Sequence, residues 1–243
     1  RKMLFRIVLL SFSIAFLVFF FKETIFEYLL APCSSDFVTF DFVNRTLALF
    51  GDSGEIYGNQ MELIATDLPS QFLAHMSMSL YIGILLSSPF IIYEIFKYIS
   101  PALYDNERKY SYRIVVAAYS LFIIGLFVSY YVLFPISCRF LASYSVSEHV
   151  KTMVTLDSYI STFVSLTFLM GIVFQLPVLS FFMAKIGVIN SSVMTEYRKH
   201  AFVLILLVAA IITPPDVMTL ILVSFPLYIL YELSIVVVKL VEK

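Results

Sequence analysis

Long apolar runs alternate with short charged segments along the chain, and these runs set its architecture. The hydrocarbon core of a bilayer is about 30 Å thick and needs roughly 20 apolar residues in helical form. Six runs approach this length, which predicts an all-α integral membrane protein with a single domain over residues 1–243. The predicted spans cover about 7–30, 72–93, 114–134, 159–184, 201–212 and 217–238.

The last two runs are shorter than the others. The fifth has 12 uncharged residues before Thr213, and the sixth has 15 before Glu232. At about 1.5 Å per residue these runs cover roughly 18 and 22 Å, so neither crosses the hydrocarbon unless Glu232 and flanking basic residues snorkel. A tight turn between them would leave Asp216 at or inside the membrane edge, where a carboxylate needs water or a partner. Asp216 also has the position of an N-cap for the sixth helix, and the two roles are compatible.

Basic residues are unevenly divided between the two sides of the predicted bundle. With the amino end in the cytoplasm, 12 of the 16 Lys and Arg residues fall in cytoplasmic segments. Cytoplasmic loops carry such an excess, so both termini are predicted to face the cytoplasm. The segment 31–71 is then a long extracytoplasmic loop. Its Gly51-Asp52-Ser53-Gly54 turn signal and its apolar patches predict a small cap over the outer side.

Composition supports the membrane interpretation and removes several function classes. Hydrophobic residues make up 60% of the chain and charged residues 14%, whereas soluble domains are about half apolar and a quarter charged. A net charge of -1 argues against nucleic acid as a partner. The two cysteines and three histidines show no metal-ligand spacing, and no nucleotide-binding, zinc-protease or nucleophile-elbow motif is present. We therefore expect no cofactor, no metal and no enzyme activity.

The cysteines Cys33 and Cys138 both fall on the predicted outer side. An oxidising compartment there would permit a disulfide, but the sequence does not give the separation of the two residues. Paired and free thiols therefore both stay open at this point.

Short segments spread over nearly the whole chain form an ordered set. The most specific stretch runs from Ser88 to Arg108, with a proline at the end of the second span, aromatics, and then Pro-Ala-Leu-Tyr followed by a Glu-Arg pair. The other segments are Leu30-Ala31-Pro32, Ala65-Thr66-Asp67 leading to Phe72, Tyr130 to Pro135, Tyr159-Ile160-Ser161, Phe174-Gln175-Leu176-Pro177, Thr213-Pro214-Pro215-Asp216, and Pro226-Leu227-Tyr228 with Leu230-Tyr231-Glu232. In this order and placement the chain resembles the TatC family.

The resemblance implies a receptor for twin-arginine signal peptides, built as a concave, glove-like bundle. It implies an acidic site on the cytoplasmic face, with Glu107 as the acid that binds arginine and Arg108 beside it. Carboxylate–guanidinium pairs are bidentate and more directional than lysine pairs. Tyr98 matches a family aromatic on the same face, and Asp105 would add negative charge. Without the resemblance, Glu107 is an ordinary solvated loop residue paired with Arg108 or Lys109.

The family also carries an amino-terminal His-Leu-x-Glu-Leu-Arg segment whose Glu completes the arginine site. This chain begins Arg1-Lys2-Met3, so we expect a trimmed start at the final Arg of that segment. No small-residue cleavage site follows the first apolar run, which is therefore not interpreted as a cleaved signal peptide. The second acid of the expected site is therefore not among residues 1–243.

A second group of residues is implied to face partner helices on the concave surface. Gln175 is a polar side chain in the middle of the fourth span, where it would contact a partner helix or form a hydrogen bond within the chain. Pro177 should kink that span and deepen the concavity. The full group consists of Gln175, Asp216, Tyr159, Phe72 and Pro32.

The resemblance also implies partners and a location. The partners would be twin-arginine signal peptides of folded cargo proteins, single-span TatA- or TatB-type proteins, further copies of the chain, and membrane lipid. The location would be the bacterial cytoplasmic membrane, or alternatively a thylakoid or mitochondrial inner membrane. Transport of folded proteins would be driven by the protonmotive force.

Three other functions fit some of the same features. A secondary transporter of a small solute would carry charged residues within spans and repeated halves, but spans three and four hold no acid or base and no repeat is evident. An integral membrane enzyme would need a catalytic motif. A scaffold that only assembles partner helices differs from the receptor in one observable, the crosslinking of a signal peptide near Glu107.

Overall fold

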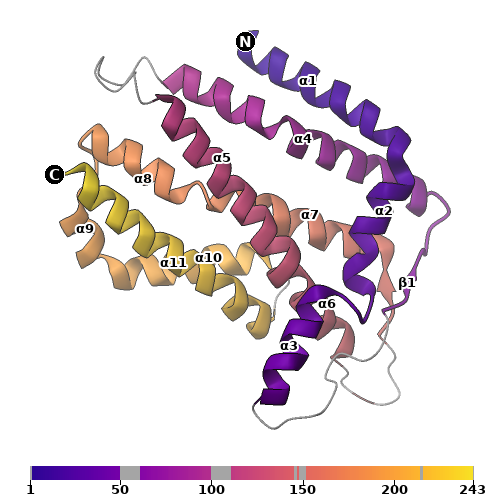
Figure 1. The fold of residues 1–243 in the computed structure, drawn as a ribbon. Coiled ribbons are helices and arrows are strands. Elements are labelled where there is room, and N and C mark those ends of the chain that lie inside the picture. The colour runs from indigo at the N-terminus through magenta and orange to yellow at the C-terminus, as the bar shows by residue number, and fades with distance from the viewer. Residues whose placement is uncertain are drawn as a thin grey trace.

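The structure is a computed structural model that describes residues 2–49, 61–99, 111–144, 147, 152–213 and 216–242. It is a helical bundle with one two-residue strand pair (Figure 1). The longer helices are α1 (Lys2–Val18), α2 (Lys22–Leu30), α3 (Val38–Leu49), α4 (Ser70–Ile99), α5 (Ser111–Val128), α6 (Phe134–Ser143), α7 (Leu156–Val173), α8 (Leu176–Lys185), α9 (Ser191–Glu196), α10 (Arg198–Ile212) and α11 (Val217–Val241). The strands are β1 (Leu63–Ile64) and β2 (Val154–Thr155).

Five helical segments within the described residues are long and apolar enough to cross a membrane. They are Met3–Asp41, Ser70–Tyr98, Ile114–Ser143, Leu156–Lys185 and Val217–Val241. Each overlaps one of the predicted spans. The predicted fifth span corresponds to α10, which has 15 residues and covers about 22 Å. The expectation that this helix is short is confirmed.

The expectation that the sixth span is short was wrong. Helix α11 has 25 residues, which corresponds to about 38 Å, and it continues without a break through Pro226 and Glu232. The Glu232 carboxylate accepts a hydrogen bond from Arg198 Nη2 at 2.8 Å and another from the Tyr228 hydroxyl at 3.2 Å. Because Arg198 of α10 and Tyr228 of α11 both lie within the bundle, the Glu232 carboxylate is hydrogen-bonded there and does not end the membrane helix.

Three of the predicted spans contain a local break. The first is a 3-10 turn over Phe19–Phe21, between α1 and α2. The third changes to a π-helical turn over Ser129–Leu133, between α5 and α6. The fourth breaks at Phe174 and Gln175, and Pro177 lies in the first turn of α8, where its missing N–H is tolerated. The predicted kink at Pro177 is therefore confirmed.

Capping residues explain where several helices begin and end. Thr155 accepts a hydrogen bond from Ser158 N at the start of α7, and Asn190 accepts one from Val193 N at the start of α9. After α8 the chain turns at Gly187, whose φ of 74° favours glycine. Near the end of α11, Glu242 accepts hydrogen bonds from the Ser191 hydroxyl and backbone N–H, which lower the pKa of its carboxyl group.

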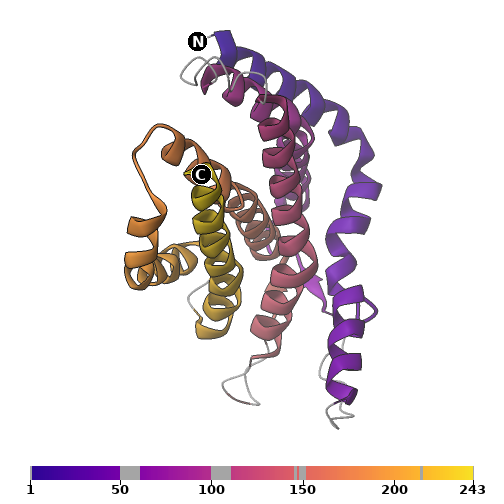
Figure 2. The same cartoon turned by 60° about the vertical axis from the view of Figure 1, so that its left-hand side comes forward.

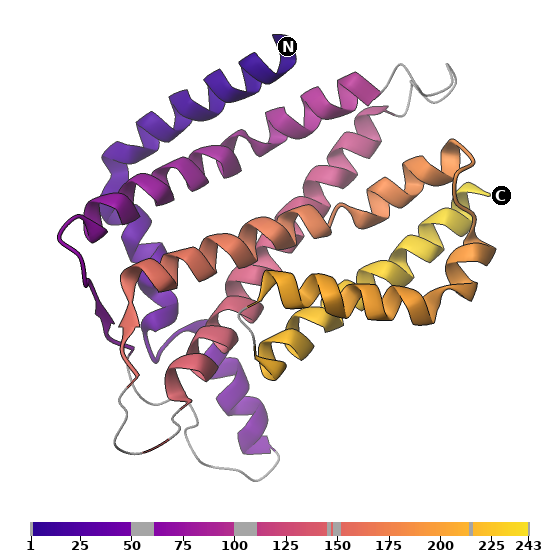
Figure 3. The same ribbon diagram turned by 180° about the vertical axis from the view of Figure 1, so that it is seen from behind.

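Each long helix packs against a few specific neighbours. Helix α1 lies along α4, α5 and α4 pack on α7, and α11 packs on α8 and α10. Figure 2 shows α9 to α11 on one side of the molecule and α1 to α3 on the opposite side. Figure 3 shows β1 and β2 side by side near the starts of α4 and α7. The strands pair in parallel, with Leu63 opposite Val154 and Ile64 opposite Thr155.

Helix α1 approaches α4 closely because small residues face each other. A Cβ added to Gly83 would lie 2.6 Å from the Ala15 Cα. Nearby, the Ser11 and Ser87 hydroxyls are hydrogen-bonded at 2.7 Å. Small and hydroxyl-bearing residues are the usual means by which membrane helices pack closely.

Helices α5 and α7 also meet at glycines. A Cβ on Gly125 would lie 2.8 Å from Phe174 Cγ, and one on Gly171 would lie 2.7 Å from Phe122 Cε2. Each glycine therefore receives a phenylalanine ring from the other segment. This reciprocal contact fixes the separation of the third and fourth membrane segments.

Candidate functional site

The carboxyl end of α4 carries the described part of the predicted signal-peptide site. Tyr98 is 76% exposed there, and the Lys97 ammonium lies 6.0 Å from the centroid of the Tyr93 ring. Helix α4 leads directly into the segment 100–110, which lies outside the described residues. Glu107 and Arg108 belong to that segment, so their predicted role stays a prediction.

A second acidic residue lies one turn before Tyr98, and the sequence analysis did not single it out. Glu94 is only 7% exposed, and its carboxylate lies 3.9 Å from Arg6 Nη1 of α1. The apolar run of the second span ends at Tyr93, so Glu94 was placed beyond the predicted helix. The helix in fact continues to Ile99 and carries this acid against α1. The only signal in the sequence was the spacing of Glu94, which lies four residues, or about one helical turn, before Tyr98.

Gln175 lies at the break in the fourth segment and is half-buried. Its Nε2 donates a hydrogen bond to the Ala118 carbonyl of α5 at 3.0 Å. This is the intramolecular contact that the sequence left as an alternative to a partner contact. In the described structure the amide therefore connects the fourth segment to α5, and the partner role stays a prediction.

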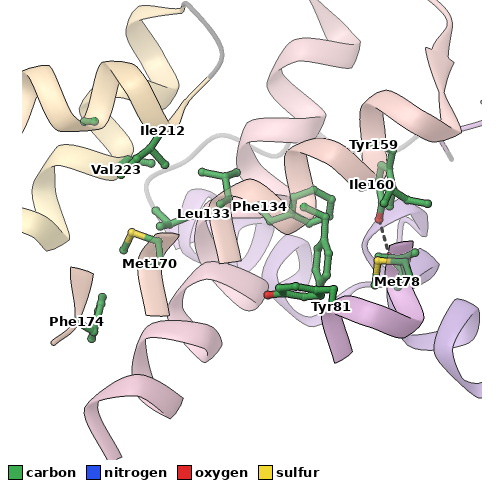
Figure 4. Packing of buried hydrophobic residues seen from close by; sticks show 14 of the residues in the cluster. Met78, Tyr81, Leu133, Phe134, Tyr159, Ile160, Met170, Phe174, Ile212 and Val223 are labelled. Atoms are coloured by element: carbon green, nitrogen blue, oxygen red, sulfur yellow. Dashed lines mark hydrogen bonds between the residues drawn. The ribbon is translucent and has the colours of Figure 1, made fainter. Parts of the chain in front are cut away.

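Tyr159 and Pro32 lie within one structural junction. The Tyr159 side chain is 1% exposed, and its hydroxyl donates a hydrogen bond to the Leu29 carbonyl at 2.7 Å. Pro32 is buried in the 3-10 turn that follows α2. Figure 4 shows Tyr159 in the buried cluster together with Phe134, whose ring centroid lies 5.0 Å away. These contacts hold the start of α7 against the end of α2.

Asp216 and Phe72, the remaining members of the predicted group, are more accessible. Asp216 caps α11, because its carboxylate accepts a hydrogen bond from Thr219 N at 2.7 Å and another from the Thr219 hydroxyl. The predicted capping role is therefore confirmed. Phe72 is 58% exposed in the first turn of α4. The structure thus does not bring all five members of this group together at one site.

Cys33 and Cys138 are free thiols that both pack against the main hydrophobic core. Arg139, next to Cys138, donates a hydrogen bond from Nη2 to the Cys33 carbonyl at 3.1 Å and lies 4.8 Å from the Phe40 ring centroid. These contacts join the turn after α2 to α6 without a disulfide.

A family comparison gives this arrangement its context. The family model described as "Sec-independent protein translocase protein (TatC)" matches residues 1–226 of the chain. The chain belongs to the TatC family. The resemblance seen in the sequence is therefore confirmed over most of the TatC chain, including the segment that holds Glu107.

Curated relatives agree with this assignment. The Sec-independent protein translocase protein TatC of Blattabacterium sp. subsp. Periplaneta americana (strain BPLAN) is 34% identical over 226 residues, covering 91% of this chain and 85% of its own length. TatCy of Bacillus subtilis (strain 168) is 35% identical over 180 residues, covering 74% of this chain and 71% of its own. This TatC-family chain is thus a multi-span membrane protein of the Tat pathway, and its general function is protein transport.

Solved structures support the same fold. The crystal structure of a twin-arginine translocase receptor TatC matches with a TM-score of 0.78 at 27% identity, covering 100% of this chain and 97% of the other. A second structure of that receptor, in DDM, matches with a TM-score of 0.75 at 26% identity, covering 98% of each chain. The whole described TatC bundle therefore follows a fold that has been observed experimentally.

Proposed function

We propose that this chain binds twin-arginine signal peptides at the carboxyl end of α4 and gathers single-span TatA- or TatB-type partners. Folded cargo would then be exported with the protonmotive force. The observation that carries the proposal is the position of Tyr98, which is 76% exposed in the last turn of α4, directly before the segment of Glu107. A TatC of closely similar fold is described as a twin-arginine translocase receptor.

The chemistry of this end of α4 suits an arginine-rich ligand. A carboxylate at Glu107 offers two acceptor oxygens to a guanidinium group, and an exposed tyrosine ring offers a flat surface on which a guanidinium can stack. Arginine fits both groups better than lysine because its head is planar and weakly hydrated. The pair therefore accounts for a preference for arginine over lysine at the same net charge.

The proposal includes a topology and a set of partner contacts. The chain would form one domain with six spans, both termini in the cytoplasm, and residues 31–71 as an outer cap. Helix α10 would be the sixth crossing element although it is short. Partner helices would contact the accessible members of the predicted group, namely Gln175, Asp216 and Phe72. Tyr159 and Pro32, the other two members, are buried and would support that surface from within. The bacterial relatives support a location in the bacterial cytoplasmic membrane.

Replacing Glu107 with Gln tests the binding role. Hydrogen bonds to a charged group are worth about 1.5–3 kcal/mol, so a twin-arginine signal peptide should bind about tenfold more weakly. Binding is measured by photocrosslinking of a labelled signal peptide to the full-length protein in membranes, alongside export of a reporter. A peptide with two lysines should be affected much less, because it lacks the bidentate contact.

Glu196→Gln is the matched control, since Glu196 is an exposed acid at the end of α9 on the same predicted side. It should leave crosslinking unchanged. Equal crosslinking of the twin-arginine peptide to Glu107→Gln and to the parent protein would disprove the receptor role of Glu107. Crosslinking lost equally in both variants would indicate a general loss of negative charge instead of a specific site.

Cysteine labelling tests the proposed orientation. In a Cys33→Ser, Cys138→Ser background, single cysteines at Ser53→Cys and Asn106→Cys are exposed to a membrane-impermeant maleimide on intact cells. Ser53→Cys should react and Asn106→Cys should react only after the membrane is opened. The reverse pattern would overturn the orientation derived from the basic residues.

A further inference from the structure

A hollow of about 490 Å³ lies where α2, β1, α4 and α7 meet, away from the proposed signal-peptide site. It sits beside the amino ends of α4 and α7, which Figure 3 shows close to the strand pair. This level of the bundle corresponds to a membrane–water interface, because two membrane segments begin there. The lining residues are Lys22, Phe26, Leu30, Leu63, Ile64, Ala65, Gln71, Phe72, His75 and Leu156.

Three polar side chains belong to this otherwise apolar lining. Lys22 is exposed at the start of α2 and forms no ion pair with the described part of the chain. Gln71 and His75 lie one turn apart on α4. The His75 ring stacks on Phe19 at 4.2 Å between centroids, and its buried Nε2 has no hydrogen-bond partner among the described residues. A cation, an amide and an imidazole ring thus line one hollow, which suits an anionic oxygen-rich group.

The acids adjacent in sequence to the lining residues lie outside the lining. Glu23 follows Lys22, Glu62 precedes β1, and Asp157 follows Leu156, where its carboxylate accepts a hydrogen bond from the Ser70 hydroxyl. Among the described residues that line the hollow, Lys22 therefore carries the only full charge.

An exposed apolar ridge leads from the hollow along α4. Phe72, Met76, Leu80 and Ile84 are 58%, 40%, 38% and 39% exposed, and residues four apart are neighbours on a helix surface. Ile84 lies twelve residues after Phe72, a rise of about 18 Å, close to the roughly 15 Å of one bilayer leaflet.

The far end of this ridge borders a second hollow. This hollow has a volume of about 260 Å³ and lies between α4 and α1. Leu80 and Ile84 line it together with apolar residues of α1, among them Val8 and Phe12. The ridge thus connects the first hollow, which has polar side chains in its lining, to the apolar second hollow. The connection is about as long as an acyl chain.

We propose that these two hollows and the connecting ridge bind one anionic phospholipid. Its phosphate would contact Lys22, Gln71 and His75, and an acyl chain would lie along the Phe72–Ile84 ridge. Basic pockets between membrane helices bind anionic headgroups in this manner. The inference goes beyond signal-peptide binding. Only the choice of leaflet, the outer one, rests on the proposed topology.

Native mass spectrometry of the delipidated protein, titrated separately with phosphatidylglycerol and phosphatidylcholine, tests the site. The parent protein should bind phosphatidylglycerol more tightly. Lys22→Gln should weaken phosphatidylglycerol about fivefold, as expected for one lysine near a lipid phosphate, and leave phosphatidylcholine nearly unchanged. Phe72→Ala should weaken both lipids alike. Lys239→Gln removes an exposed lysine at the end of α11 and should change neither.

Two results would overturn the proposal. Equal phosphatidylglycerol binding by Lys22→Gln and Lys239→Gln would mean that Lys22 only snorkels to the interface. Displacement of phosphatidylglycerol by inorganic phosphate at the same concentration would mean that the hollow binds the anion without the acyl chain. Unchanged thermal unfolding of Lys22→Gln before lipid addition confirms that it is folded. Since Glu107 takes no part, failure here leaves the receptor proposal untouched, and the reverse also holds.

Discussion

Replacing Gly83 with Val should lower the stability of the bundle by about 3 kcal/mol, the upper part of the range for overpacking a close contact. The added Cβ would lie 2.6 Å from the Ala15 Cα and 2.7 Å from its N. These are backbone atoms of α1, so no side-chain rotation can make room and the helices must move apart. Their separation would also break the hydrogen bond between Ser11 and Ser87.

Thermal unfolding of the purified protein in detergent measures this effect. Leu86→Val is the matched control, because it places the same β-branched residue on the 57% exposed face of α4. It should unfold near the temperature of the parent. If Gly83→Val and Leu86→Val unfold at the same temperature, the close approach of α1 to α4 does not exist in the protein.

Replacing Gly125 with Val should have an effect of similar size on the contact between α5 and α7. Its Cβ would lie 2.8 Å from Phe174 Cγ and 2.9 Å from the Met170 carbonyl oxygen. The Phe174 ring could turn away, but the carbonyl oxygen belongs to the helix backbone. The Gln175 hydrogen bond to the Ala118 carbonyl crosses the same interface and would lengthen as the helices separate.

The same unfolding assay applies, with Ile124→Val as the control at a neighbouring position that is 48% exposed. Gly171→Val should have a smaller effect than Gly125→Val, since its Cβ meets only the Phe122 ring, at 2.7 Å, and that ring can turn away. A parent-like Gly125→Val protein would show that the third and fourth segments are not fixed by these glycines.

The positions of the membrane helices could be predicted because the apolar runs follow directly from the thickness of the bilayer. All predicted spans correspond to helices, and the shortness of α10 follows from its 12 uncharged residues before Thr213. The length of α11 could not be predicted from the same rule. Glu232 interrupts the apolar run, and only the fold reveals that Arg198 lies 2.8 Å from it.

The local breaks were only partly predictable. Pro177 indicated the break in the fourth segment, since proline cannot continue a helix hydrogen-bond ladder. The 3-10 turn at Phe19–Phe21 contains no proline or glycine, so no local signal marked it. The π-helical turn at Ser129–Leu133 is followed by Pro135 in the first turn of α6, and a proline there disturbs the helix hydrogen bonds before it.

The type of candidate site could be predicted from the segment that resembles TatC. The contacts that its residues make could not be predicted. Sequence spacing did not show that Tyr159 is 1% exposed or that Gln175 bonds to Ala118. It also did not show that Glu94 is buried against Arg6, because that contact joins residues 88 positions apart. Side-chain burial depends on the arrangement of helices, which a single sequence does not specify.

The packing of α1 has a consequence for local unfolding. This helix packs chiefly on α4, and only 11% of the most apolar stretch of the segment Met3–Asp41 is buried, whereas α7 is enclosed by α4, α5 and α6. Opening free energies in a folded protein are lowest for the elements with the fewest buried contacts. We therefore expect the amides of α1 to exchange as a separate cooperative unit, with a protection that depends on the contact with α4 and on the surrounding lipid.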